Sequence, residues 1–303
     1  MITSLFSKSK PINYLIVVVL IILLFVSVNY NAIRFSLNSA LIELTKLIVL
    51  IVSFILLSFI VTKNNLTQKN SYAILTFTFL FALFSEALSN LDLLFSNLFV
   101  LLALRRIISL HTATNTKKKL FEAAFWIALA TLFYFWALLY FAVLLVALLY
   151  YAQNSTKNSI IPFVGIATVS VLLISYNIVV FNQYILPSNF NTQTRFNYTT
   201  YNNLESIIKL TTLFALFIWV FIYYLKPSEH KKLKPSYFLI SCTSAIAILI
   251  GIIAPVKSGS EFIFLFAPFS ILMANYIEII TEHWFKEVFV TAFILVALVC
   301  LLL

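Results

Sequence analysis

The chain is poor in charge, glycine and cysteine. Only 10% of its 303 residues are charged, whereas 62% are hydrophobic, and just three are glycine and two cysteine. A soluble globular domain is about one quarter charged and about half apolar, so this composition excludes an ordinary soluble fold. Glycine loops that bind phosphate are excluded because no GxxxxGK[ST] or GxGxxG pattern is present. No CxxC or HExxH spacing occurs, and we therefore expect no metal and no cofactor.

Long apolar segments recur along the whole chain. About 20 apolar residues span a bilayer core as a helix, and a barrel would instead need short alternating segments. The sequence therefore predicts an all-α integral membrane protein with about 11 transmembrane helices in one domain, residues 1–303. The predicted segments are 12–30, 41–61, 72–86, 92–104, 120–134, 136–151, 160–181, 207–225, 237–254, 262–280 and 287–303.

Loop charge decides how two ambiguous stretches cross the membrane. Lysines before the first segment place the N-terminus in the cytoplasm by the positive-inside rule. If 72–104 were a single helix, Arg105 and Arg106 would lie outside, against that rule. The sequence thus predicts that 72–104 and 120–151 are each a hairpin of two short helices. Fifteen of the 20 basic residues then face the cytoplasm, leaving outside Arg34, Lys46, Arg195, Lys209 and Lys257.

The basic loops on the cytoplasmic side also explain the net charge of +10. Basic loops that face the cytoplasm meet anionic lipid, so we expect membrane lipids as partners and no nucleic acid.

Charges of both signs gather on the predicted outer side. Glu86 and Asp92 flank the turn of the first hairpin, and Glu43 lies near the start of the second segment. Helices of about 14 residues are too short to cross a core about 30 Å thick, which favours a polar cavity on this side. A polar outer loop at about 182–205 would cover it. Simple anchoring of helix ends is the alternative explanation for each of these charges.

The stretch "SNLFVLLALRRIISL", followed by "KKKLFEAAFWIALATLFYFWALLYFAVLLVALLY", resembles the C superfamily of multi-spanning glycosyltransferases. Members of that superfamily transfer sugar from a polyprenyl-phosphate donor and usually carry a catalytic acid in their first outer loop. Here that loop has no acid before Glu43. The resemblance implies an outer carboxylate as the base, with Asp92 and Glu86 as the first candidates and Glu43 as the next. It also implies that Arg34, Arg195 and Lys257 bind the lipid phosphate.

A second likeness extends over the full length. "FSKSKPINYLI", "SNLFVLLALRRI" and "SGSEFIFLFAPFSILMANYIE" resemble an uncharacterised family of bacterial inner-membrane proteins, which implies a cell envelope location but no activity. Three functions follow for consideration. The leading hypothesis is a glycosyltransferase-like protein that acts on or near lipid-linked envelope glycans. The alternatives are a non-enzymatic scaffold or assembly factor and, less favoured because the helix centres lack charge, a transporter.

Overall fold

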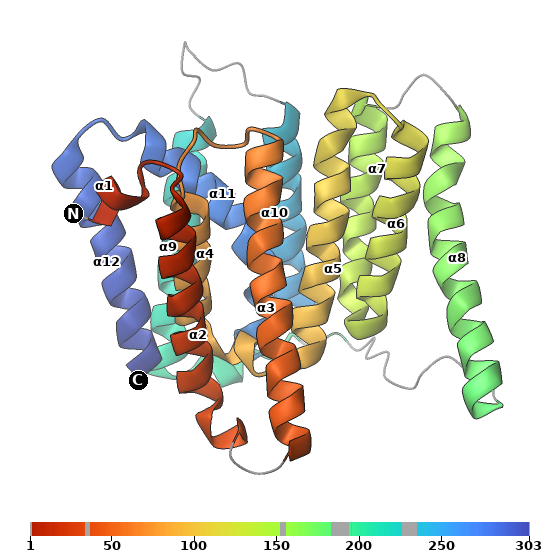
Figure 1. Ribbon diagram of the computed structural model, residues 1–303, viewed down its shortest axis with the longest axis horizontal. Helices are drawn as coiled ribbons and strands as arrows, with labels where there is room; N and C mark the ends of the chain where they lie inside the picture. Colours follow the sequence, from red (N-terminus) through yellow and green to blue (C-terminus); the bar gives the residue numbers. More distant parts are fainter. Residues whose placement is uncertain are drawn as a thin grey trace.

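The computed structural model describes residues 2–33, 37–151, 156–182, 194, 196–225 and 235–302. Within these ranges the chain is helical and contains no strand (Figure 1). Eight helices are long and apolar enough to cross a membrane. The chain is therefore an all-α, multi-pass membrane protein. The helices are α1 (Ile2–Phe6), α2 (Pro11–Ile33), α3 (Leu37–Lys63), α4 (Tyr72–Leu83), α5 (Leu91–Ile108), α6 (Thr116–Phe133), α7 (Tyr140–Tyr151), α8 (Thr156–Phe181), α9 (Leu204–Leu225), α10 (Pro235–Ile253), α11 (Ile263–Ile279) and α12 (His283–Leu302), with 3-10 turns η1 (Ser85–Leu88), η2 (Ser109–Thr112), η3 (Phe135–Leu139), η4 (Thr199–Tyr201) and η5 (Ser260–Phe262).

Helix α11 lies at the centre of the bundle. All its residues from Ile263 to Ile277 are buried, and it packs against α4, α5, α9 and α10. Helix α11 has apolar side chains on every side, as expected for a helix that is surrounded by protein. At one edge of the bundle, α8 packs against α6 and leaves most of its own surface exposed (Figure 1).

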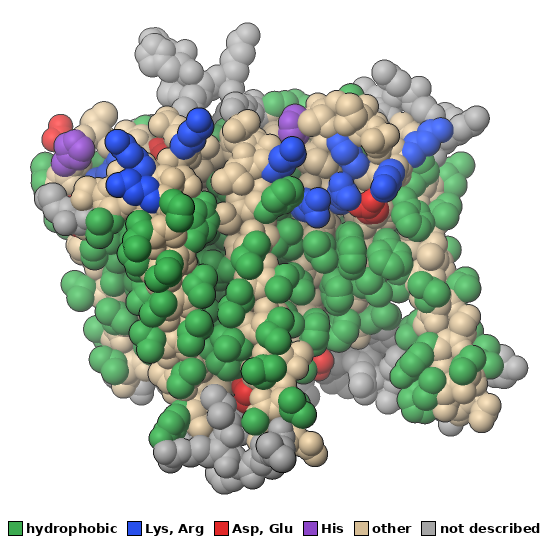
Figure 2. Space-filling model, viewed as in Figure 1, with side chains coloured by type: hydrophobic (Ala, Val, Ile, Leu, Met, Phe, Trp, Pro, Cys, Tyr) green, Lys and Arg blue, Asp and Glu red, His purple; other side chains and the backbone are tan. Residues whose placement is uncertain are grey.

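The two ends of the bundle differ in charge. Figure 2 shows a belt of apolar side chains and, at the end that holds the N-terminus, a band of Lys and Arg. We call this the basic end; its described basic residues are Lys8, Lys10, Lys63, Lys69, Arg105, Arg106, Lys117, Lys118, Lys119 and Lys286. The opposite end carries Glu43, Lys46, Glu86, Asp92, Glu205, Lys209, Lys257 and Glu261. The hairpin prediction required this separation, in which most basic residues lie at one end and the acidic residues with a few lysines lie at the other.

Both predicted hairpins are confirmed. Helices α4 and α5 are separated by η1, and α6 ends at Phe133, after which the extended backbone of Tyr134 (φ −146°, ψ 107°) leads into η3 and α7. Helix α4 has only 12 residues, a length of about 18 Å at 1.5 Å per residue. It is shielded as expected for so short a helix, because every residue in it except Phe79 is buried.

The prediction that all four hairpin helices are short was wrong for two of them. Helices α5 and α6 each have 18 residues, about 27 Å, and extend past the apolar segments 92–104 and 120–134. Each apolar segment is bounded at the basic end by Arg105 or Lys119, but the helix continues because Lys and Arg stems lie along apolar surface while their charges reach the interface. An ion pair between Arg106, in the extension of α5, and Glu122 joins α5 to α6.

The positive-inside rule predicts that the basic end faces the cytoplasm. We expect a cysteine at Asn202, exposed at the opposite end, to react with an impermeant maleimide in intact cells, whereas a cysteine at Thr114, exposed at the basic end, reacts only after permeabilisation. Both variants are made with Cys242 and Cys300, the two native cysteines, replaced by alanine. Labelling with the reverse pattern would invert the orientation.

Candidate functional site

Three interruptions of helices meet at the opposite end. They are the α4–α5 turn, the break at Tyr134 and the connection between α10 and α11. Together they enclose a cavity of about 390 Å³. Its lining is mostly polar by residue type and consists of Glu86, Ser89, Asn90, Leu93, Tyr134, Val256, Ser258, Ser260 and Glu261. The cavity predicted from the short hairpins is therefore present at this end, and polar side chains lie among its lining although most of the lining surface is apolar.

Local sequence explains why the chain turns here. The Asn90 side chain caps α5 by accepting a hydrogen bond from the backbone N–H of Leu93 at 3.2 Å. On the facing connection, Gly259 has φ +92°, and a Cβ at this position would lie 3.0 Å from the Phe84 ring. Only glycine adopts this backbone conformation without strain and leaves room for that ring. The two connections can thus approach each other closely around the cavity.

Glu86 has one carboxylate oxygen engaged and one free. Its Oε1 accepts a hydrogen bond from Lys209 Nζ at 2.6 Å, and the same ammonium also donates to Glu205. The Lys209 side chain is only 3% exposed. Glu86 Oε2 is buried and has no hydrogen-bond partner in the described part of the chain. A buried acceptor without a partner is costly, so a hydrogen-bond donor placed at this oxygen would be stabilising.

Glu261 is held from two sides. It accepts a hydrogen bond from the Tyr201 hydroxyl and another from the backbone N–H of Ser258 at 3.3 Å. Tyr201 comes from the short segment before α9, where Tyr198 also donates to the carbonyl of Ile252 at 3.2 Å. The predicted outer loop therefore reaches the cavity through its last residues. Residues 183–193 and 195 of that loop lie outside the described ranges.

Lys257 lies in the connection that follows α10 and does not line the cavity. Its ammonium donates to the carbonyls of Gly251 and Ile252 at 2.8 and 2.6 Å, and it lies 5.0 Å from the Tyr198 ring. A cation here satisfies carbonyls that the helix leaves unpaired and interacts favourably with the helix dipole. Burial lowers the pKa of this ammonium below its ordinary value. Two N–H donors of the Lys257 ammonium are therefore already hydrogen-bonded within the protein and cannot also bind a phosphate.

The structure separates the three predicted acids. Of these, Glu86 alone lines the cavity. Asp92 is exposed in the first turn of α5, where Asn90 and not Asp92 provides the cap. Glu43 is buried within α3 and pairs with Lys46 at 2.7 Å, one turn along the same helix. Arg34 and Arg195, two of the three predicted phosphate ligands, lie outside the described residues.

From the sequence, Lys209 was placed on the outer side, but neither Lys209 nor Glu261 was chosen as a site residue. Lys209 meets Glu86 across 123 positions of sequence, and no local pattern could pair them. A weak signal did exist for Glu261, since "PVKSGSE" places it beside a glycine in a connection between two apolar segments. That signal would have suggested a turn, but not which side chains the turn would face.

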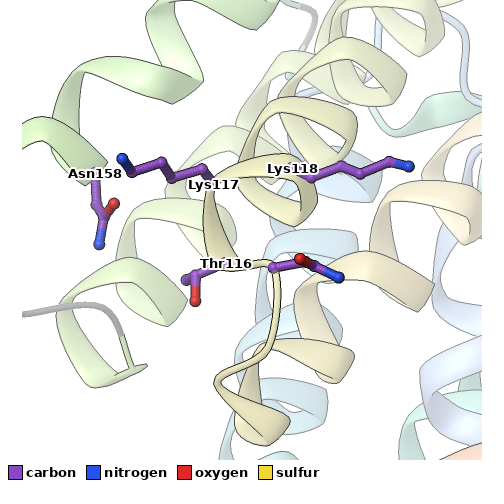
Figure 3. Close-up of a pocket in the computed structure, with 5 residues that line it drawn as sticks. Thr116, Lys117, Lys118 and Asn158 are labelled. Atoms are coloured by element: carbon purple, nitrogen blue, oxygen red, sulfur yellow. The ribbon is translucent and has the colours of Figure 1, made fainter.

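A second hollow lies at the basic end, where the N-terminal ends of α6 and α8 approach each other. It measures about 620 Å³ and is lined by Asn115, Thr116, Lys117, Lys118 and Asn158. Figure 3 shows Lys117 extending toward Asn158, whereas Lys118 extends the other way. Lys117 and Lys118 are both exposed, and they suit contact with anionic lipid at a membrane surface. No group of three acidic, histidine or cysteine side chains suited to a metal occurs among the described residues.

Comparison with known proteins gave one match. The model of a family of unknown function, DUF6427, covers residues 1–302. The chain belongs to this family. No curated protein and no solved structure matched. The predicted membership of an uncharacterised family is confirmed, and for this DUF6427 member the polar cavity is the principal evidence about activity.

Proposed function

We propose that this DUF6427 protein is a multi-pass membrane enzyme of glycosyltransferase type that acts on lipid-linked glycans of a bacterial envelope. The observation that carries the proposal is the carboxylate of Glu86, a residue that lines the cavity and whose Oε2 has no hydrogen-bond partner among the described residues. A positioned carboxylate of this kind suits the removal of a proton from an acceptor hydroxyl.

The cavity suits a sugar by its chemistry. Ser89, Ser258 and Ser260 offer hydroxyls, Asn90 offers an amide, and Tyr134 contributes an aromatic ring. Hydroxyl and amide groups both donate and accept, which matches the hydroxyls of a carbohydrate. Sites of about 300–1,000 Å³ with a few convergent polar groups are typical of small-molecule binding, and this one measures about 390 Å³.

In the proposed reaction, Glu86 Oε2 accepts the proton of the acceptor hydroxyl. The acceptor oxygen then forms a bond to the anomeric carbon of the donor sugar, and the bond from that carbon to the lipid phosphate oxygen breaks with its electron pair. Lys209 orients the carboxylate through Oε1. Positive charge for the departing phosphate would come from Arg34 and Arg195, because the third predicted cation, Lys257, donates to helix carbonyls and does not line the cavity.

The site would lie on the outer face of a bacterial cytoplasmic membrane, with the N-terminus inside, because the cavity is at the end opposite the basic band. A non-enzymatic scaffold is the second candidate. It is favoured by α8, which stands at the edge of the bundle and exposes Val171, Leu172 and Val179 along a face that a partner helix could cover.

Reconstitution tests the proposal. The purified protein in proteoliposomes is given an isotopically labelled polyprenyl-phosphate sugar and an envelope glycan acceptor, and transfer is followed by mass spectrometry. We expect labelled acceptor to accumulate with time and protein amount. If a deletion strain has altered envelope glycans but the protein transfers no sugar, and carboxylate variants restore the wild-type glycans, the scaffold function is supported instead.

A further inference from the structure

The hollow at the basic end is built by the first turns of α6 and α8. Its volume is about 620 Å³, and two lysines and no acidic side chain occur among the described residues that line it. Lys117 extends toward Asn158 in this hollow (Figure 3). An ammonium and a side-chain amide both donate hydrogen bonds, so the lining suits an oxyanion.

Close packing of α6 and α8 limits how far the hollow extends toward the centre of the membrane. Both helices begin at the basic end and run in the same direction (Figure 1). A Cβ at Gly165 would lie 2.8 Å from the Ala124 Cβ and 3.0 Å from the Phe121 carbonyl oxygen, so only glycine permits this approach. Gly165 lies seven residues beyond Asn158, about 10 Å along α8. A ligand in the hollow is therefore held near the cytoplasmic interface, outside the hydrocarbon core.

Lys117 is the cation in this region that the protein leaves available. Arg106 pairs with Glu122, and the same carboxylate lies 4.0 Å from the Lys118 ammonium. Lys119 is buried and donates two hydrogen bonds of 2.6 Å to η2. Lys117 is exposed, and its ammonium has no ion pair or hydrogen bond within the described part of the chain. An anion bound by Lys117 would therefore displace no existing partner.

Apolar surface that faces lipid begins directly below the hollow. Ile160, Phe163 and Val164 are exposed on α8, two to six residues beyond Asn158. At 1.5 Å per residue they lie about 3–9 Å deeper. The hollow thus lies at the boundary between the basic band and the apolar belt that Figure 2 shows. A ligand that fits both sides of this boundary combines an anionic head with hydrocarbon chains, whereas a soluble anion would use only the polar side.

We propose that the hollow between α6 and α8 binds the phosphate group of an anionic phospholipid from the cytoplasmic leaflet, with Lys117 as the principal ligand. Lysine binds phosphate as a point charge, and basic pockets between transmembrane helices on the cytoplasmic side suit anionic head groups. The surrounding charge favours an anionic over a zwitterionic lipid, because the described basic-end residues of α5 and α6 are five basic and one acidic: Arg105, Arg106, Lys117, Lys118, Lys119 and Glu122. This binding does not depend on the proposed sugar transfer.

Photolabelling tests the site in the full-length protein. Nanodiscs of phosphatidylcholine receive a trace of phosphatidylglycerol that carries a diazirine close to its head group, and labelled peptides are mapped. We expect label to concentrate in 115–118 and 158–164. Lys117→Gln should reduce that label about fivefold, which corresponds to the roughly 1 kcal/mol that one lysine contributes at an anionic membrane surface. In lipid-free detergent the same variant should unfold at the wild-type temperature, so that the loss of label reports binding.

Lys63→Gln is the matched control, because Lys63 is also exposed at the basic end but belongs to α3. It should leave the label in the hollow unchanged. An equal loss of label in both variants would replace the discrete site with diffuse attraction to the whole basic band. Equal labelling by a phosphatidylcholine with the same diazirine would overturn the choice of an anionic head. Loss of the label when soluble glycerol phosphate is added would make this a site for soluble phosphate compounds and overturn the lipid assignment.

Discussion

Replacing Glu86 with glutamine is expected to slow glycosyl transfer by about 100- to 10,000-fold, the range that a general base contributes. Glutamine has the same size and keeps an oxygen that can accept the hydrogen bond from Lys209, so the bundle should still fold. Its amide nitrogen cannot accept a proton from the acceptor hydroxyl. The initial rate of transfer in proteoliposomes, normalised to the amount of folded protein, measures the effect.

Glu282→Gln is the matched control for this change. Glu282 is exposed at the basic end, far from the cavity, and its replacement should leave the rate unchanged. Asp92→Asn and Glu43→Gln are measured in parallel because the sequence proposed them as alternative bases. A Glu86→Gln protein that transfers sugar at the wild-type rate would contradict the role of Glu86, and a selective loss in either parallel variant would assign the base to that residue.

Removing Lys209 should have the largest effect on stability. We expect Lys209→Met to lower the free energy of unfolding by about 1.5–3 kcal/mol, because it removes a buried ammonium that is hydrogen-bonded to two partly exposed carboxylates. The Lys209 side chain is 3% exposed and serves both Glu86 and Glu205. Methionine fills a similar volume but leaves the two carboxylates facing each other. Thermal unfolding of the detergent-solubilised protein, followed by intrinsic fluorescence, measures the loss.

A triple variant that also neutralises the two carboxylates distinguishes unpaired charge from poor packing of the methionine side chain as the cause of the lost stability. Lys209→Met combined with Glu86→Gln and Glu205→Gln removes the uncompensated charge and should regain much of the lost stability. Lys117→Met provides the control, since Lys117 is exposed at the basic end and a surface change of this kind costs within about 0.5 kcal/mol. If Lys209→Met unfolds at the wild-type temperature, the ion-paired cluster does not stabilise the bundle.

The hairpins illustrate how far loop charge can predict a membrane fold. The stretch 72–104 is ambiguous by apolar length, yet the position of Arg105 and Arg106 requires that it turn back, and the structure contains that turn. Helix ends were harder to predict, because α5 and α6 continue beyond their apolar segments into charged residues. Hydropathy reports which residues lie in lipid, whereas a helix ends where its backbone hydrogen bonds find other partners.

The sequence by itself determined the all-α membrane class of the protein, its two hairpins and the segregation of charge between two ends. These follow from the bilayer, which acts on every residue according to its depth and needs no knowledge of neighbours. Only the tertiary structure decided which charges form a site. Glu86, Asp92 and Glu43 look alike in the sequence, but one lines the cavity, one is exposed and one is paired within its own helix. Lys209 and Glu261 join Glu86 there because helices distant in the chain pack side by side, and a contact between residues more than a hundred positions apart has no local signature.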